Sequence, residues 1–132
     1  MLKKLFYNIL FISWMVFVTF SSLFSFEGMQ MGSFAFRIPH LDKMVHFIFY
    51  LVMVVTGFFA IKDYLVHRYK ASAILLGMVV FSIMYGMIIE VLQYSVTSNR
   101  QGDILDALAN SLGAITGMFL TRSLFYKGEQ LK

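Results

Sequence analysis

The sequence contains no cysteine and a single proline, and only 14% of its 132 residues are charged. Without cysteine, disulfide bonds and thiolate chemistry are excluded, and any metal ion would need histidine, carboxylate or carbonyl ligands. Hydrophobic residues make up 59% of the chain, and its mean hydropathy is +0.75. Together with the scarcity of charge, this composition indicates a membrane protein rather than a soluble domain.

Four long apolar runs, at residues 5–26, 44–61, 71–94 and 104–126, predict four transmembrane helices. Each run approaches the roughly 20 residues that a helix needs to cross the hydrocarbon core of a bilayer. None of them alternates with a period of two, as the strands of a membrane barrel would. The predicted fold class is therefore all-α, a polytopic four-helix transmembrane bundle forming a single domain over residues 1–132.

Lysine and arginine are divided unequally between the two ends of this bundle. Eight of them fall on the side of both termini and the 62–70 connector, whereas Arg37, Lys43 and Arg100 fall on the other side. Because cytoplasmic loops are enriched in these residues, we expect both termini in the cytoplasm. The basic residues lie in short connectors, where orientation and lipid headgroups explain the formal charge of +4 without nucleic acid as a partner.

Acidic residues gather at the opposite, outward end of the predicted bundle. Five of the seven lie there: Glu27, Asp42, Glu90, Asp103 and Asp106. An ionised carboxylate within hydrocarbon costs about 2.5–3.5 kcal/mol even on the mildest scales. Such residues persist only where something holds them, so we expect a functional site beside them, on the extracytoplasmic side.

At about 100° per residue, the polar positions of three apolar runs each fall on one helix face. These faces consist of Asp42, Lys43, His46 and Tyr50 in the second run; Ser82, Gly86, Glu90 and Gln93 in the third; and Asp103, Asp106, Asn110, Gly113 and Gly117 in the fourth. Because the three polar faces lie at the same outer depth, we expect them to meet in a polar pocket that also includes Arg100.

Helix capping is the simplest structural explanation for the acidic residues. Asp42 and Asp103 are suited to capping the N-termini of the second and fourth helices, where the helix dipole favours an anion. Capping accounts for at most one acid per helix, however, and leaves Glu90, Asp106 and Asn110 unexplained. The pattern therefore favours a functional pocket over a purely structural network.

Other residues of these faces also have structural interpretations. The Gly113-x-x-x-Gly117 spacing, and with it Gly86, predicts the close approach of a neighbouring helix, although the motif alone is common. His46 taken alone is typical of a hydrogen-bonded residue in helix packing. Tyr50 taken alone is typical of an anchor at headgroup depth.

Taken in order, three motifs resemble the VanZ-like family of small bacterial membrane proteins: Asp42-Lys43-x-x-His46-Phe47-x-x-Tyr50, Glu90-x-x-Gln93, and Arg100-x-x-Asp103-x-x-Asp106-x-x-x-Asn110-x-x-Gly113. The resemblance runs from Asp42 to about Gly117, and the first run and the tail add nothing to it. The family takes its name from a protein associated with resistance to the glycopeptide teicoplanin. The resemblance implies a multi-pass protein of the bacterial cytoplasmic membrane with an envelope role, and it carries over no catalytic assignment.

Two functions stay open at the level of sequence. In the first, the pocket binds an envelope lipid headgroup or a lipidated amphiphile, with Lys43 and Arg100 contacting phosphate or carboxylate. In the second, the protein is a hydrolase or transferase acting on a lipid-linked substrate, with His46 as general base and a divalent cation held by Asp103 and Asp106. No nucleophile motif or phosphate-binding glycine loop supports the enzyme.

Three further expectations complete the sequence-based interpretation. A proton or ion pathway is disfavoured, because the supply of polar residues nearly stops below Asn110. No organic cofactor is expected, while a divalent cation stays open. A four-helix bundle of this size is also compatible with a homodimer.

Overall fold

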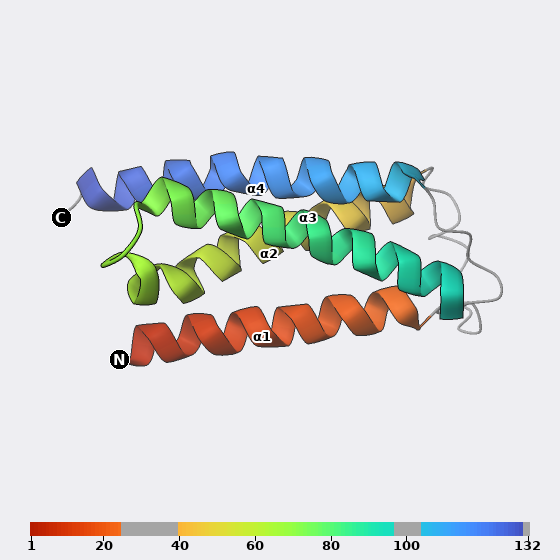
Figure 1. The fold of residues 1–132 in the computed structure, drawn as a ribbon, viewed down its shortest axis with the longest axis horizontal. Coiled ribbons are helices and arrows are strands. Elements are labelled where there is room, and N and C mark those ends of the chain that lie inside the picture. Colours follow the sequence, from red (N-terminus) through yellow and green to blue (C-terminus); the bar gives the residue numbers. More distant parts are fainter. Residues whose placement is uncertain (25–39, 97–103, 131–132) are drawn as a thin grey trace.

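The computed structural model describes residues 1–24, 40–96 and 104–130, and these form four long helices (Figure 1). The helices are α1 (Leu2–Leu23), α2 (Leu41–Leu65), α3 (Ala71–Val96) and α4 (Ile104–Gln130). No strand occurs within the described residues. Each helix is long and apolar enough to cross a membrane, which confirms the all-helical architecture expected from the four apolar runs.

The helix bounds differ from the apolar runs mainly at the ends. Helix α1 ends at Leu23, before the end of the first run, whereas α2 covers Leu41–Leu65 and exceeds the second run on both sides. Hydropathy marks only the part of a helix that matches hydrocarbon, and a helix can continue into the headgroup region with polar residues. The longer α2 therefore includes Asp42 and Lys43 within its first turn.

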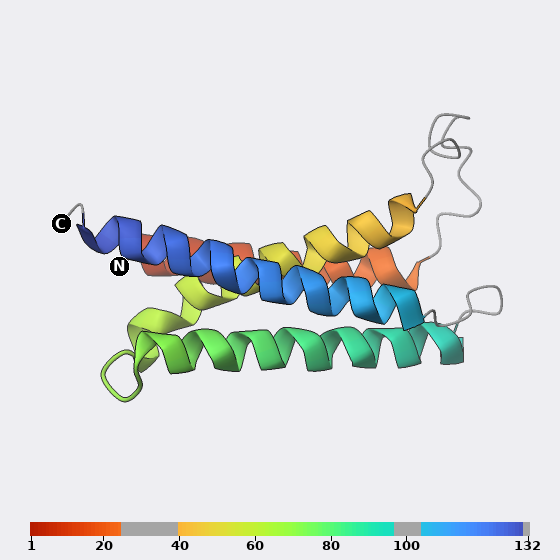
Figure 2. The same cartoon turned by 90° about the horizontal axis from the view of Figure 1, so that it is seen from above.

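Helix α2 is the centre of the bundle. It packs most extensively against α4, and it also contacts α1 and α3. Both ends of the chain lie at the same end of the molecule (Figure 1), and α2 crosses α4 at an angle when the bundle is seen from above (Figure 2). This antiparallel arrangement places the start of α2, the end of α3 and the start of α4 together at the opposite end.

Two glycines of α4 allow it to approach α2 closely. A Cβ atom added at Gly113 would lie 2.1 Å from the carbonyl oxygen of Phe47, and one added at Gly117 would lie 2.7 Å from that of Leu51. Only a hydrogen atom fits at these positions, as at the small-residue contacts of other membrane helices. The contact fixes the spacing between the N-terminal parts of α2 and α4.

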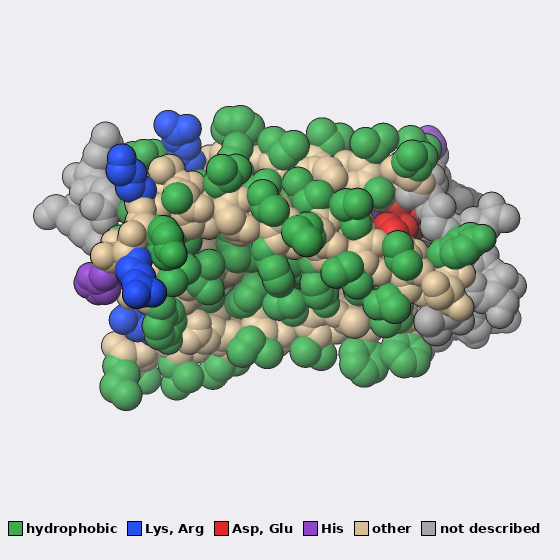
Figure 3. Space-filling model, in the orientation of Figure 1, with side chains coloured by type: hydrophobic (Ala, Val, Ile, Leu, Met, Phe, Trp, Pro, Cys, Tyr) green, Lys and Arg blue, Asp and Glu red, His purple; other side chains and the backbone are tan. Residues whose placement is uncertain are grey.

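The apolar core lies along α2 and the facing sides of its neighbours. It is formed by Val18 of α1; Tyr50, Met53, Val54 and Phe58 of α2; Ile74, Leu75, Met78 and Val79 of α3; and Ala114 of α4. Apolar side chains also cover much of the face seen in Figure 3 between the two ends of the molecule. In the same view, lysine and arginine gather at the end that carries the chain termini, and acidic side chains lie near the other end.

Candidate functional site

Polar side chains from three helices converge at the end of the bundle opposite the chain termini. We call this group the polar cluster; it consists of Asp42, Lys43 and His46 from α2, Glu90 from α3, and Asp106 and Asn110 from α4. The residues of α2 and α4 lie within the first two turns of their helices, beside the close contact at Gly113. Four cluster members are buried: His46, Glu90, Asp106 and Asn110.

A hydrogen-bonded chain runs from α2 through α4 to α3. Nδ1 of His46 lies 3.0 Å from Oδ1 of Asn110, and Nδ2 of Asn110 lies 3.4 Å from Oε1 of Glu90. The amide nitrogen of Asn110 donates to the carboxylate of Glu90, and its amide oxygen therefore accepts a hydrogen bond from His46. Nδ1 of His46 is therefore the protonated nitrogen, and Nε2 carries the lone pair when the ring is neutral.

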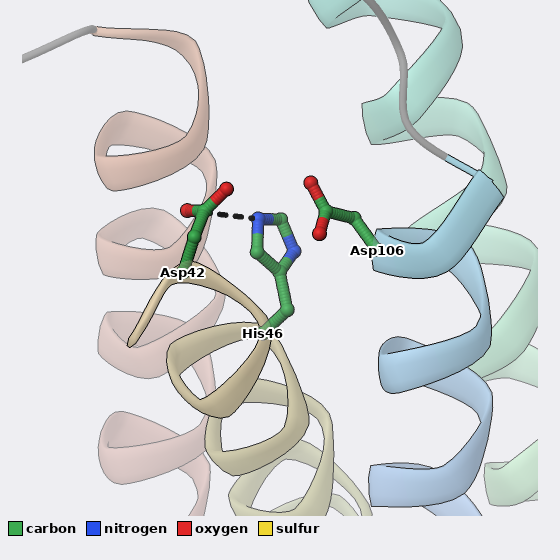
Figure 4. A group of neighbouring side chains, drawn as sticks. All are labelled: Asp42, His46 and Asp106. Atoms are coloured by element: carbon green, nitrogen blue, oxygen red, sulfur yellow. Dashed lines mark ion pairs between the residues drawn. The ribbon is translucent and has the colours of Figure 1, made fainter. Parts of the chain in front are cut away.

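Two acidic residues flank the imidazole of His46. Oδ1 of Asp42 lies 3.8 Å from Nε2 of His46, and Asp106 approaches the ring from α4, so that the ring stands between the two carboxylates (Figure 4). Asp106 is itself paired with Lys43, whose Nζ lies 3.3 Å from Oδ1. One ligand atom from each of Asp42, His46 and Asp106 lies within 4.8 Å of the others, so these residues could hold a metal ion.

One buried oxygen of the polar cluster makes no hydrogen bond with the part of the chain that the structure describes. Oε2 of Glu90 has no partner within the described part of the chain, although Oε1 accepts from Asn110 and lies 3.8 Å from Nδ1 of His46. The hydroxyls of Tyr50 and Ser82 are likewise buried without a partner among those residues. Buried polar atoms of this kind are uncommon in proteins, because each lost hydrogen bond with water is normally replaced.

Gln93 links α3 to the end of α1. Its Nε2 donates a hydrogen bond of 2.7 Å to the carbonyl oxygen of Ser22, in the last turn of α1. The last four carbonyls of a helix have no partner within the helix. The side chain of Gln93 thus satisfies an end of α1 from the neighbouring helix α3.

Five other residues have roles assigned from the sequence: Asp42, Tyr50, Gly86, Arg100 and Asp103. Arg100 and Asp103 lie outside the described residues. Asp42 is not the cap of α2, because the cap is His40, which has a φ of 62° and no side-chain capping bond. Tyr50 is fully buried in the bundle rather than anchored at its surface. Gly86 faces the cluster, since a Cβ there would lie 3.1 Å from Nδ2 of Asn110.

A comparison with protein families adds to this geometry. A model of the VanZ/LLP1 family matches residues 4–126, which is nearly the whole chain. The chain belongs to the VanZ/LLP1 family. No curated protein and no solved structure matches it. Because the family match begins within α1, the expectation that the first apolar run adds nothing to the resemblance is wrong.

Polar contacts join α1 to α2 and α3 in this VanZ/LLP1 protein. Nε1 of Trp14 donates a 2.9 Å hydrogen bond to the carbonyl oxygen of Phe49 in α2, and the hydroxyls of Thr19 and Tyr85 join α1 to α3. Sequence reasoning missed these contacts. The available signal was the presence of polar side chains in this run, Trp14 and Thr19 among them.

Two apolar cavities lie away from the polar cluster, among residues nearer the chain termini. One, of about 430 Å³, is lined by Phe11, Ile61, Leu65, Tyr69, Ala73, Ile74, Gly77, Met78 and Phe81. The other, of about 270 Å³, is lined by Phe58, Ala71, Ser72, Leu75, Leu76, Met118, Arg122, Phe125 and Tyr126. Neither cavity includes a cluster residue, so contacts of the cluster with a ligand are expected to be polar ones.

Proposed function

We propose that the polar cluster binds the headgroup of an envelope lipid or of a lipidated amphiphile. The observation that carries this proposal is the buried Oε2 of Glu90, which lacks a hydrogen-bond partner in the described residues. Leaving a buried acceptor unsatisfied costs about 1–3 kcal/mol. An amine or hydroxyl of a headgroup would donate to this oxygen and offset that cost.

The charges of the cluster suit such a headgroup. Glu90 and Asp106 offer acceptors to an ammonium or hydroxyl group, and Asn110 offers both a donor and an acceptor. Lys43 lies beside Asp106 at the edge of the cluster, where it can contact a phosphate or carboxylate as a point charge. Arg100 would add a second cation for phosphate.

The distribution of basic residues supports an outward-facing site. Lysine and arginine gather at the end of the bundle that carries both termini (Figure 3). In bacterial membrane proteins such residues are enriched in cytoplasmic segments. The proposed location is therefore the bacterial cytoplasmic membrane, with the polar cluster on the extracytoplasmic side. Capture of an envelope lipid or amphiphile there would change susceptibility to glycopeptides, in line with the association from which the VanZ family takes its name.

Native mass spectrometry of the purified protein released from mild detergent tests the proposal. The wild type is compared with Asp106→Asn and Glu90→Gln, and Asp63→Asn serves as a matched control because Asp63 pairs with Lys62 outside the cluster, at 2.7 Å. We expect a retained lipid mass on the wild type and on Asp63→Asn, and its loss from both cluster variants. Identical lipid retention in all four proteins would overturn the proposal.

An enzyme acting on a lipid-linked substrate is the second candidate. It is favoured by His46, whose protonated Nδ1 is held by Asn110 while Nε2 faces Asp42, as in a general base oriented by its neighbours. Incubation of the wild type with extracted envelope lipids would then convert one lipid mass into another. His46→Gln would bind the lipid without conversion, whereas simple binding predicts no new mass with either protein.

A further inference from the structure

The geometry points to a divalent transition-metal site formed by Asp42, His46 and Asp106, of the kind that takes Zn²⁺. The three residues come from two helices, α2 and α4, and converge around one imidazole ring (Figure 4). This inference goes beyond headgroup binding and does not depend on it, because the ion is held by side chains of the protein alone.

The distances are close to those that a metal ion requires. The three ligand atoms lie within 4.8 Å of one another, and Oδ1 of Asp42 is 3.8 Å from Nε2 of His46. Tetrahedral zinc, with bonds of about 2.0–2.1 Å, places its ligand atoms about 3.3 Å apart. Side-chain rotations that move these atoms by about 1 Å would close the site. The side chain of Asp42 is 48% exposed and has room for this movement.

The orientation of His46 is the one that zinc-binding histidines adopt. Its Nδ1 donates to Oδ1 of Asn110 at 3.0 Å, which leaves the lone pair of Nε2 on the side of Asp42. Metal-bound histidines almost always donate their other ring nitrogen to an oxygen in this way, which fixes both the tautomer and the ring. The site therefore has an outer partner for its histidine ligand as well as the ligands themselves.

A second, independent observation comes from α3. Glu90 is nine-tenths buried and directs Oε1 to 3.8 Å from Nδ1 of His46, while its Oε2 has no partner in the described residues. Glu90 and Asp106 are therefore two buried carboxylates close to one imidazole. A divalent cation beside His46 would attract both of them, and so offset part of the cost of burying their charge.

The ligand types determine which ions fit. One imidazole nitrogen and two carboxylate oxygens suit zinc and related transition metals better than Mg²⁺ or Ca²⁺, which prefer oxygen ligands alone. Lys43 contacts Oδ1 of Asp106, so the second oxygen of that carboxylate is the one available to the ion. Three protein ligands leave a fourth position for water or for an oxygen of a bound molecule.

The test is a zinc titration of the full-length protein in nanodiscs of one defined phospholipid, after removal of metals with a chelator. A fluorescent zinc chelator serves as the competitor. We expect one Zn²⁺ per chain in the wild type, and binding weakened at least about tenfold in His46→Gln and Asp42→Asn. His67→Ala and Asp63→Asn remove the same residue types outside the site and should bind zinc as the wild type does.

Cobalt(II) absorption provides a second readout, and Asp42→Asn provides a second variant. Cobalt(II) bound at the site should give visible absorption bands that are absent from His46→Gln and unchanged in His67→Ala. If His46→Gln does not fold, Asp42→Asn decides, because its half-exposed position leaves the packing intact. The inference is wrong if the wild type takes up no zinc, or if the site variants and the controls bind it equally. Neither result alters the lipid masses that test the proposed function.

Discussion

Asn110 of α4 accepts a hydrogen bond from His46 of α2, with Oδ1 and Nδ1 separated by 3.0 Å. Its amide nitrogen faces Glu90 of α3 at 3.4 Å, so one buried side chain links three helices. A side-chain network in an apolar surrounding is strong when it is complete and costly when one member is missing. Asn110 is therefore the residue on which the geometry of the polar cluster depends most directly.

We expect Asn110→Leu to destabilise the bundle and to release His46. Leucine has a similar volume but leaves Nδ1 of His46 and Oε1 of Glu90 without their amide partner. The expected loss in the free energy of unfolding is about 1–2 kcal/mol. Nitrogen NMR of a histidine-labelled sample should show that His46 no longer occurs only as the tautomer protonated at Nδ1.

Asn8→Leu is the matched control for this substitution. The amide of Asn8 also makes a side-chain hydrogen bond, of 2.9 Å to the hydroxyl of Tyr64, but at an exposed position. We expect little change in stability and none in the His46 signals. An unchanged His46 tautomer in Asn110→Leu would contradict the role assigned to Asn110.

Gly113→Ala tests the close contact between α2 and α4. The new methyl carbon would lie 2.1 Å from the carbonyl oxygen of Phe47, so the helices must separate. Overpacking of this kind costs about 1–3 kcal/mol. Gly77→Ala is the control, since a Cβ there meets nothing within 4 Å. It should stabilise α3 by about 0.5–1 kcal/mol through helix propensity.

Thermal unfolding of both glycine variants in the same detergent checks this pair of expectations. The melting temperature should fall for Gly113→Ala and stay level or rise for Gly77→Ala. A melting temperature of Gly113→Ala equal to that of the wild type would show that α2 and α4 can move apart at this point without cost.

Gln93→Leu should loosen the end of α1. It removes the 2.7 Å hydrogen bond from Nε2 of Gln93 to the carbonyl oxygen of Ser22, which is worth about 1 kcal/mol. Backbone amides in the last turn of α1 should then exchange with deuterium about fivefold faster. Tyr94→Phe, at the neighbouring exposed position, should leave this exchange unchanged. Equal exchange in both variants would mean that Gln93 does not hold α1.

The helix faces of the polar cluster could be predicted from the sequence, but the contacts between its helices could not. The helical spacing of Asp42 and His46, and of Asp106 and Asn110, placed each pair on one face, because side chains four residues apart on a helix share a face. The contact of Asn110 with both His46 and Glu90 could not be predicted, because it depends on how far apart α2, α3 and α4 lie. The hydrogen bond from Gln93 to α1 could not be predicted for the same reason, since its partner Ser22 is 71 residues away in the chain.

The four membrane-spanning helices, and the polar faces of three of them, follow from the sequence alone. Both properties are local, because length, hydropathy and a period of 3.6 residues require no knowledge of a neighbouring helix. The position of His46 between Asp42 and Asp106, and its contact with Asn110, became visible when the helices were seen packed together. That arrangement depends on the distance between α2 and α4, which close packing at Gly113 and Gly117 sets.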